Sequence, residues 1–543
     1  MSKFTSTLVG ALVLVALAGC SDNLVVMNPN SPDEARALAR PTDVENLVGA
    51  AFRTINNYTD GDVLRINAQL LCAGMENYSG LANAGMGPAC AIPRPGVDNS
   101  RGNQTLSEKY QPYLNIYQAV RSVALGLNRL NDPAFTFYPT SIPQQQRDRA
   151  FAYFEIGVGL GDIAMVYDSG AAVAPNDDPQ VVKPLEHYTV LGPYALAQLD
   201  SAIAIATASG TGFPLPDTWI NGNALTAAQF IALARSWKAR IRAGLARTPA
   251  DRAAVDWAQV IADAAAGITA NFTINMRSSA PAWTYRPAQM DLFADWHQMW
   301  QFIVGMADTS GAYSAWLGTA VTQRSPFLVI TPDLRFPQGT TRAAQNTASG
   351  CTATSCTPPR TDIFFRNRPS GTDVPSNPLG FSMYDFYRFN SVLTASPPRT
   401  GPVPVVTVAE MNLLRAEGLI RTGNIPAAAA LISISRTAHG LPSVAAMTDT
   451  LAAVPGGNAC VPKVPQPPAY TSAACGNLFD ALRWEKRMET AYTHWGAWWI
   501  DGRGWGELPA NTPLQYPVPY QELDTRREPS YTYSTGAAGK WGL

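Results

Sequence analysis

Apolar residues recur at the spacing of an α-helix along most of this chain, and this pattern constrains the fold more than any other feature. The first stripe follows Pro41, a residue that favours the first turn of a helix, and it runs through Val44, Val48 and Phe52. Similar stripes predict helices over Tyr110–Leu130, Gln144–Val166, Tyr188–Ala206, Thr226–Ala246, Asp251–Ile268, Val406–Arg421, Ile425–His439 and Leu478–Trp498. Each stripe needs another element to cover it, so the sequence predicts a mainly α protein.

Several of these stripes come in pairs joined by short polar turns. Thr226–Ala246 is followed directly by Asp251–Ile268. Val406–Arg421 is followed in the same way by Ile425–His439. Consecutive antiparallel helices of this size stack as tetratricopeptide-like units, each burying its apolar face on the next. Because no regular repeat of about 34 residues is visible, we expect an irregular tetratricopeptide-like helical array.

The periodicity fades between residues 270 and 402, where Pro, Gly, Asn and Ser interrupt short apolar runs. This segment is expected to be variable and rich in loops, with minor strands and short helices. The stretch 58–104 has the same character and lies within an N-terminal helical part, 41–269, while 403–543 forms a C-terminal helical part. We expect one compact body whose loops carry the binding function.

The start of the chain has the pattern of a lipoprotein signal peptide. Lys3 precedes the apolar run Leu8–Ala18, which is shorter than the roughly 20 residues of a transmembrane helix, and Cys20 follows two small residues. We expect residues 1–19 to be removed, Cys20 to carry acyl chains such as palmitate, and 20–40 to form the lipid tether and the start of the fold. The alternative is an ordinary secretory signal with a chance cysteine.

The other six cysteines fall into neighbouring pairs in loop-like stretches. They are Cys72 with Cys90, Cys351 with Cys356, and Cys460 with Cys475. An exported protein can form disulfides, so we hypothesise that each neighbouring pair forms one. Six cysteines also allow other connectivities. Zinc is the alternative, but no Cys-x2-Cys pair or nearby histidine completes a tetrahedral set, and no metal site is expected.

The charge and the motifs argue against nucleic-acid binding and against catalysis. The formal net charge is −1 and 15% of residues are charged, which is not the basic footprint of a nucleic-acid-binding protein. There is no Gly-x-Ser-x-Gly elbow and no phosphate-binding loop. None of the four histidines stands in a metal-ligand pattern: His187, His297, His439 and His494. We therefore predict a protein that is not an enzyme, with no catalytic residues and no cofactor.

Three blocks near the C-terminus follow one another in the order typical of a known family. Arg483–Ala491 resembles its "ER…E" helix, Tyr492–Gly506 resembles the "G-x-R-x-x-D-L-x-R-x-G" that follows, and Pro517–Leu523 resembles "P-I-P-x-x-E-L". Four earlier blocks agree with them: Tyr117–Asn128, Arg149–Ile163, Ala409–Gly418 and Ile434–Leu441. The chain thus resembles the SusD/RagB family of nutrient-binding outer-membrane lipoproteins over its mature length. Departures such as Ala164, where the family usually has proline, mark it as a divergent member.

The resemblance implies a fold and a function. It implies a SusD-like helical array that captures oligosaccharides or peptides and delivers them to a SusC-like, TonB-dependent transporter. It also implies attachment to the outer membrane through the lipid of Cys20, with the body at the cell surface. The alternative is a structural or assembly lipoprotein that uses its helical array only for contacts with other proteins.

Sugar rings stack on aromatic side chains while their hydroxyls bind polar groups, so aromatic residues beside polar ones in loops are candidate ligand contacts. The predicted ligand-binding residues are Asn77, Tyr78, Trp283, Tyr285, Arg286, Trp300 and Trp316. The alternative for Trp300 is a core position on one helical face with Trp296 and His297.

The family motifs themselves are expected to be structural. Glu410 and Glu417 are expected to bind neighbouring helix ends or partners such as Arg436. A buried ion-pair lattice is predicted for Arg483, Glu485, Arg487 and Glu489, and core positions for Trp495, Trp498, Trp499 and Trp505.

Overall fold

The structure is a computed structural model that describes residues 38–59, 66–79, 85–103, 107–135, 142–178, 181–210, 213–277, 279–284, 298–349, 363–368, 382–393, 395–532 and 536–543. The predicted signal peptide, the lipidation site Cys20 and the pair Cys351 and Cys356 lie outside the described residues, as do Tyr285 and Arg286.

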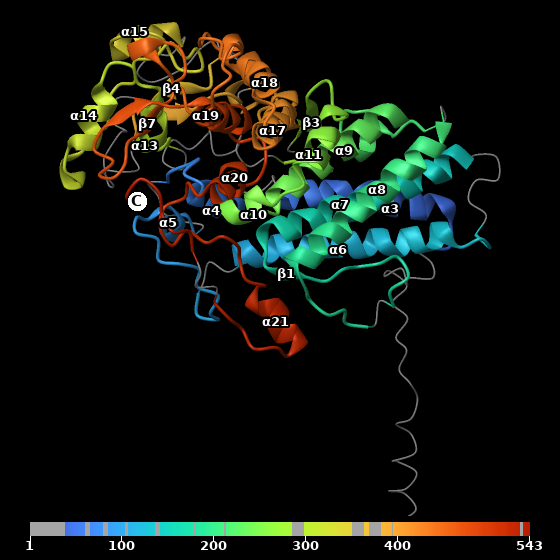
Figure 1. Cartoon of the computed structure of the whole chain (residues 1–543). Helices are drawn as coiled ribbons and strands as arrows, with labels where there is room; N and C mark the ends of the chain where they lie inside the picture. Colours follow the sequence, from blue (N-terminus) through green and yellow to red (C-terminus); the bar gives the residue numbers. More distant parts are fainter. Residues whose placement is uncertain are drawn as a thin grey trace, which may run out of the picture.

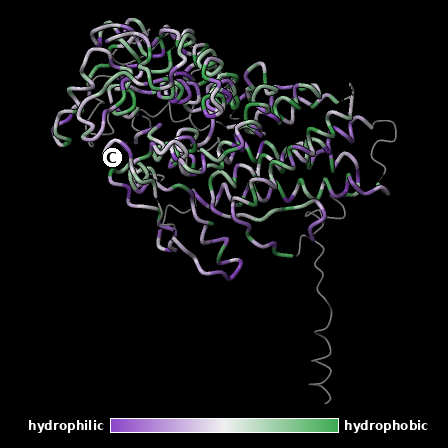
Figure 2. Tube along the Cα trace, in the orientation of Figure 1, coloured by the Kyte–Doolittle hydropathy of each residue, from purple (hydrophilic) through white to green (hydrophobic). Residues whose placement is uncertain are grey.

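Long helices pack side by side in the N-terminal part of the chain (Figure 1). They are α3 (Pro41–Thr59), α6 (Ser107–Asn131), α7 (Ile142–Val166), α8 (Tyr188–Ala208) and α9 (Ala227–Gly244). The helix α7 contacts α3, α6, α8 and α9 and is buried over most of its length. Hydrophobic and hydrophilic stretches alternate along the helical traces, as expected for helices that bury one face (Figure 2).

Three glycines explain how α7 can lie at the centre of this layer. A Cβ atom on Gly157 would lie 2.7 Å from Leu199 of α8, one on Gly159 would lie 2.8 Å from Val120 of α6, and one on Gly161 would meet Ile241 of α9. The three positions therefore face three different helices, and each needs a residue without a side chain for the close approach.

The array continues through α10 (Pro249–Ala253) and α11 (Trp257–Ala265), at the end of the N-terminal part, into the C-terminal part. The C-terminal part contains α17 (Val408–Arg421), α18 (Ile425–Ala438), α19 (Leu478–Thr490) and α20 (Ala497–Trp505). The helix α17 contacts α9, α11, α18 and α19, which links the two parts. The prediction of a mainly α, tetratricopeptide-like array is confirmed.

Two predicted helices are each broken in two. The predicted helix Asp251–Ile268 consists of α10 and α11, because the Asp256 side chain accepts the backbone N–H of Gln259 and starts a new helix. The predicted helix Leu478–Trp498 consists of α19 and α20. Between them Tyr492 and Gly496 have φ angles of 58° and 64°, which lie in the left-handed region and cannot continue a right-handed helix.

The segment 270–402 contains minor strands and short helices among loops, as predicted. The strand β3 (Phe272–Met276) pairs antiparallel with β6 (Gly401–Val406), so a two-stranded sheet joins the beginning of this segment to its end. Between them lie α13 (Gln301–Val304), α14 (Ala312–Gly318), α15 (Arg342–Ala348), β4 (Phe365–Asn367), β5 (Tyr384–Phe386) and α16 (Asn390–Leu393).

Short elements complete the described fold. They are α4 (Ile66–Ala73), α5 (Met86–Cys90), β1 (Ser169–Gly170), β2 (Glu186–His187), β7 (Lys463–Pro465), β8 (Ala473–Cys475), α21 (Tyr520–Arg526) and four 3-10 turns, Asp217–Trp219, Gly305–Ala307, Val321–Gln323 and Gly457–Ala459.

Two of the predicted disulfides are present, Cys72–Cys90 and Cys460–Cys475. Among the described residues α8 alone is long and apolar enough to cross a membrane, and it packs between α7 and α9 as core helices do.

The helix α20 joins two hydrophobic cores. Trp499 belongs to the core of the long N-terminal helices, and the adjacent Trp498 belongs to the core built on α4, α19 and the variable segment. The indole N–H of each donates to a backbone carbonyl, of Pro513 for Trp499 and of Arg487 for Trp498, both at 2.7 Å. The predicted core role of this tryptophan cluster is confirmed.

We predict that Gly157→Val lowers the free energy of unfolding by about 1–3 kcal/mol, because the added side chain overlaps Leu199 and the backbone oxygen of Ala195. Urea unfolding followed by circular dichroism measures the effect. Gly102→Val is the matched control, since its Cβ would have only Ser100 nearby, at 3.9 Å. Equal stabilities of the two variants would contradict the close packing described for α7.

Candidate functional site

The charged residues of the family motifs form buried ion pairs between helices. Arg240 on α9 binds Glu410 on α17 through two hydrogen bonds of 2.8 and 2.6 Å. Arg252 on α10 binds Glu417 on α17 in the same way and also contacts Asp501 on α20 at 3.1 Å. Burial alone would raise the pKa of each glutamate, but the paired guanidinium lowers it below the usual value.

A second group of charges lies between α19 and the variable segment. Arg335 is buried and binds Asp333, Glu485 and Glu489, while His439 contacts Glu489 at 2.9 Å. Arg483 and Arg487 both pair with Glu507. The predicted lattice is confirmed. The expected partner Arg436 was wrong for Glu410 and Glu417, whose partners come from α9 and α10, and it lies instead 3.6 Å from Glu485.

The structure brings four of the predicted ligand-binding residues together in the second core. The indole N–H of Trp300 donates to the backbone oxygen of Asn77 at 2.7 Å, and the rings of Tyr78 and Trp300 meet edge to face at 5.3 Å. Trp316 lies in the same core, against Phe302. Asn77 and Trp300 are 0% exposed, Tyr78 is 7% exposed and Trp316 is 5% exposed. Their side chains therefore contact protein in this conformation, and a ligand role for them stays a prediction.

Trp283 is also buried, but in the core of the long helices, where its ring packs on Phe52. The segment that carries Trp283 is hydrogen-bonded to the end of α3. The side chain of Asn57 donates to the backbone oxygen of Ala282 and accepts from the backbone N–H of Thr284, both at 3.0 Å. The chain that leads to the predicted Tyr285 and Arg286 thus passes beside the C-terminal end of α3.

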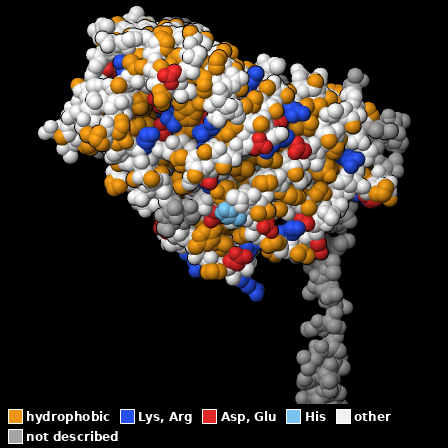
Figure 3. Space-filling model, viewed as in Figure 1, with side chains coloured by type: hydrophobic (Ala, Val, Ile, Leu, Met, Phe, Trp, Pro, Cys, Tyr) orange, Lys and Arg blue, Asp and Glu red, His pale blue; other side chains and the backbone are white. Residues whose placement is uncertain are grey.

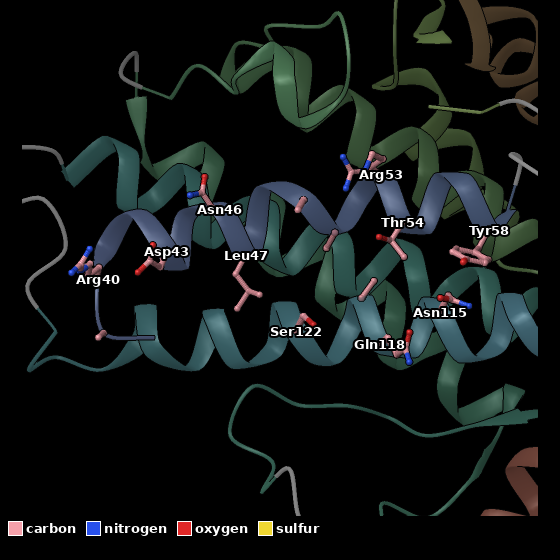
Figure 4. Close-up of a pocket in the computed structure, with 14 residues that line it drawn as sticks. Arg40, Asp43, Asn46, Leu47, Arg53, Thr54, Tyr58, Asn115, Gln118 and Ser122 are labelled. Atoms are coloured by element: carbon pink, nitrogen blue, oxygen red, sulfur yellow. The ribbon is translucent and has the colours of Figure 1, made fainter. Parts of the chain in front are cut away.

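A groove that sequence reasoning missed runs between α3 and α6. It has a cavity volume of about 1010 Å³ and is open to solvent. Its depth comes from small side chains, Ala50 and Ala51 on α3 and Ala119 and Ser122 on α6, that leave space between two helices in contact. Figure 4 shows the polar residues along its two walls: Arg40, Asp43, Asn46, Arg53, Thr54 and Tyr58 on or just before α3, and Asn115, Gln118 and Ser122 on α6.

Several of these polar side chains have no hydrogen-bond partner within the described part of the chain: Asn46, Arg53, Thr54, Gln118 and Ser122. They are partly or fully exposed, so their donors and acceptors face water. A ligand in the groove could displace this water and take over its hydrogen bonds. Tyr58 adds an aromatic ring at one end of the groove. At this end the Ala282–Thr284 segment is hydrogen-bonded to the neighbouring Asn57.

The sequence did contain a signal for this groove. Asn46, Ala50 and Arg53 follow one another at helical spacing on the face of α3 opposite its apolar stripe. Asn115, Gln118 and Ser122 do the same on α6. What the sequence does not contain is the pairing of these two faces, which are brought together only by the packing of α3 on α6.

Metal-ligating side chains do not cluster in the described part of the structure. The described residues contain no group of three or more His, Cys, Asp or Glu side chains that could hold a metal ion. On the face drawn in Figure 3, basic and acidic side chains are intermixed and form no large patch of one sign.

Comparison with known proteins places this architecture in a fold class. No family model matches the sequence, and no curated protein matches it at a significant level. Solved structures match nearly all of it. A SusD-like protein from Bacteroides fragilis NCTC 9343 has a TM-score of 0.54 at 14% identity, covering 91% of this chain and 97% of its own.

Two further structures give the same result. A SusD superfamily protein from Bacteroides vulgatus ATCC 8482 has a TM-score of 0.53 at 12% identity, covering 91% of this chain and 94% of its own. A structure described as a laminarin-binding SusD-like protein has a TM-score of 0.50 at 14% identity, covering 91% of this chain and all of its own. The chain therefore has the SusD-like fold, and the resemblance predicted from its motifs is confirmed at the level of the fold.

We predict that Glu417→Gln lowers the free energy of unfolding by about 3–5 kcal/mol, because it leaves the buried Arg252 guanidinium without its main carboxylate. Chemical denaturation at neutral pH measures the loss. Asp524→Asn is the control: it removes the partner of Arg101, whose side chain is 68% exposed, and should leave the unfolding midpoint unchanged. A Glu417→Gln protein as stable as the parent would show that this pair does not hold the helices together.

A pH-dependent prediction concerns Glu76, which is fully buried next to the predicted Asn77. Burial raises the pKa of Glu76 to about 8. Backbone hydrogen bonds from Tyr492 and Trp498 lower this pKa, but by less than burial raises it. The folded protein therefore keeps this proton up to about pH 8, whereas the unfolded chain releases it near pH 4.5, the ordinary pKa of a glutamate. The contribution of Glu76 to stability should fall as pH rises from 5 to 8, with a slope of at most about 1.4 kcal/mol per pH unit.

Glu76→Gln removes this titration, so the variant should lose less stability than the parent between pH 5 and pH 8. Denaturant unfolding at both pH values measures the difference. Glu528→Gln, at an exposed position, should follow the parent at both. A Glu76→Gln protein with the same pH dependence as the parent would mean that Glu76 is ionised in the folded state.

Proposed function

We propose that this protein is a non-enzymatic binding lipoprotein that captures oligosaccharides at the outer membrane and delivers them to a SusC-like, TonB-dependent transporter. The SusD-like fold over 91% of the chain supports nutrient binding as the class of function. One of the matching structures is described as laminarin binding, which supports a glycan as the ligand. The lipid on Cys20 would hold the body at the outer membrane, on the cell surface.

The observation that carries the proposal is the groove between α3 and α6. Its volume of about 1010 Å³ is near the upper end of the range of ligand pockets, about 300 to 1,000 Å³, and suits an extended oligosaccharide. The walls offer amides and hydroxyls, which bind sugar hydroxyls as both donors and acceptors, and the guanidinium groups of Arg40 and Arg53, which donate. Tyr58 provides an aromatic ring at one end, close to the segment that leads to Tyr285 and Arg286. A peptide remains the alternative ligand.

Binding without catalysis is the consistent chemistry for this arrangement. The groove carries one carboxylate, Asp43, whereas glycoside hydrolysis uses a pair of carboxylates on either side of the bond. The buried motif carboxylates Glu410 and Glu417 are held by arginines and lie away from the groove. We therefore propose that transport of the bound sugar, and any energy it needs, depend on the partner transporter.

We predict that Ala50→Trp weakens glycan binding by at least about tenfold, because the indole fills the groove at an exposed position without entering the core. Laminarin oligosaccharides are a suitable first probe, and a glycan array extends the search, with isothermal titration calorimetry on the mature chain as the measurement. Ala430→Trp is the matched control, at an exposed position on α18, and should bind like the parent.

The proposal is overturned if the folded protein binds no glycan or peptide and recovers no barrel protein when captured from native membranes. If it instead recovers soluble or periplasmic proteins through its helical array, the structural or assembly function is favoured. If glycan binds but Ala50→Trp has no effect, the function stands and the groove is not its site.

A further inference from the structure

A second, smaller hollow lies where the disulfide-closed loop meets the start of α6 and the chain before α21. It has a cavity volume of about 300 Å³, at the lower end of the range of ligand pockets. Its polar lining comes from four separate parts of the chain: Gln69 on α4, Arg94 and Asp98 after α5, Lys109 on α6, and Tyr516. Ala73, Pro88, Val97 and Pro513 add an apolar wall. In Figure 1, α4 and α5 lie together near one end of the long helices.

Arg94 is buried beside this pocket without an acidic partner. Its guanidinium donates only to neutral groups: the hydroxyl of Thr512 at 3.3 Å and the backbone oxygens of Cys72, Ala73, Ala89 and Ala91. No carboxylate among the described residues contacts it. Burial lowers its pKa to about 9, so it remains charged at neutral pH. The pocket therefore has a positive charge beside it that nothing in the described structure neutralises.

The lining also offers donors that a ligand could use. Gln69 is 4% exposed, and its side-chain Nε2 donates to no described group. The hydroxyl of Tyr516 likewise has no hydrogen-bond partner among the described residues, although its ring is buried. The ammonium of Lys109 lies 5.8 Å from the centre of that ring and donates to the backbone oxygen of Asp98 at 3.3 Å. The donors of Gln69 and Tyr516, which have no described acceptor, lie close to the guanidinium of Arg94, which has no described carboxylate partner, and this combination favours an anionic ligand.

One acidic residue, Asp98, also lines the pocket, but it does not neutralise Arg94. Its carboxylate accepts the backbone N–H of Ser100 at 2.8 Å and lies in an exposed part of the rim. The lining thus carries two positive charges and one negative charge, with the negative one toward solvent. In a partly enclosed pocket, where water screens less, this arrangement attracts an anion.

The geometry of the pocket is held rigidly. The disulfide Cys72–Cys90 joins α4 to α5, and Arg94 hydrogen-bonds to the backbone oxygens of Cys72 and Ala73 on α4. Thr512, bound by the same guanidinium, brings in the segment that carries Tyr516. Donors fixed in advance bind a ligand at a smaller entropic cost than mobile ones.

We propose that this pocket binds the carboxylate of a single acidic sugar residue, such as a uronic acid. Arg94 supplies the charge, Lys109, Gln69 and Tyr516 supply the hydrogen bonds, and the apolar wall accepts the face of the ring. The size of the pocket limits it to about one sugar residue, in contrast to the long groove between α3 and α6. The sugar part of this assignment rests on the proposed function, and the carboxylate part rests on the pocket alone.

The test compares ligands that differ in one group. Glucuronate and glucose are titrated into the mature chain by isothermal titration calorimetry, with acetate as a carboxylate without a ring. We expect glucuronate to bind at least about tenfold more tightly than glucose or acetate. Equal affinity for glucose would overturn the carboxylate assignment, and equal affinity for acetate would overturn the sugar assignment.

Variants locate the site. Lys109→Met should weaken glucuronate binding about tenfold or more, and Tyr516→Phe, which removes only a hydroxyl, about three- to tenfold. Lys183→Met removes the same charge outside this pocket, where Lys183 pairs with Asp177, and should bind like the parent. Unchanged binding in both Lys109→Met and Tyr516→Phe would overturn the assignment to this pocket.

The same measurements separate this inference from the proposed function. Ala50→Trp blocks the groove between α3 and α6 but should leave glucuronate binding unchanged. If neutral glycans bind in the groove and glucuronate does not bind at all, this inference fails and the proposed function stands.

Discussion

The structure depends on one buried cation, Arg252. It lies on the short helix α10 between the two parts of the chain, and it binds Glu417 on α17, Asp501 on α20 and the backbone oxygen of Ala243 on α9. Lys486 on α19 shares Asp501. Because a buried charge without its partner is costly, these helices can adopt few other relative positions. The ion pairs thereby fix where the helices lie, and the hydrophobic cores on either side supply most of the stability.

The two hollows differ because different constraints shape them. The groove between α3 and α6 exists because small side chains face each other across two packed helices, and its walls carry hydrated polar groups. The smaller pocket exists because a disulfide and Arg94 hold a loop against α4, and most of its polar groups are buried, with Asp98 exposed at the rim. The first arrangement suits a long neutral ligand and the second suits a short charged one. The SusD-like fold provides the scaffold for both but determines the chemistry of neither.

Much of the fold could be predicted from the sequence, since helical periodicity and capping are local properties. The stripe of α3 predicted its helix closely, and the neighbouring cysteines predicted two disulfides that the structure contains. The site was harder to predict. Aromatic residues in loop-like sequence favour stacking on sugars and therefore predict Trp283, Trp300 and Trp316 as ligand contacts, yet all three are buried here. Sequence composition does not show which loops fold back onto the core, and this decides whether an aromatic ring meets solvent or protein.

The sequence alone determined the class of fold, the order of its helices and the motif charges that had to be paired. These features follow from spacing within a few turns of chain, where i and i+4 neighbours are known in advance. The tertiary structure alone decided the partners of those charges, with Glu410 and Glu417 bound by arginines about 165 to 170 positions away. It also decided that the polar faces of α3 and α6 meet, and that Arg94 lies beside Tyr516. Contacts over such separations depend on how whole helices pack, and no local pattern encodes that.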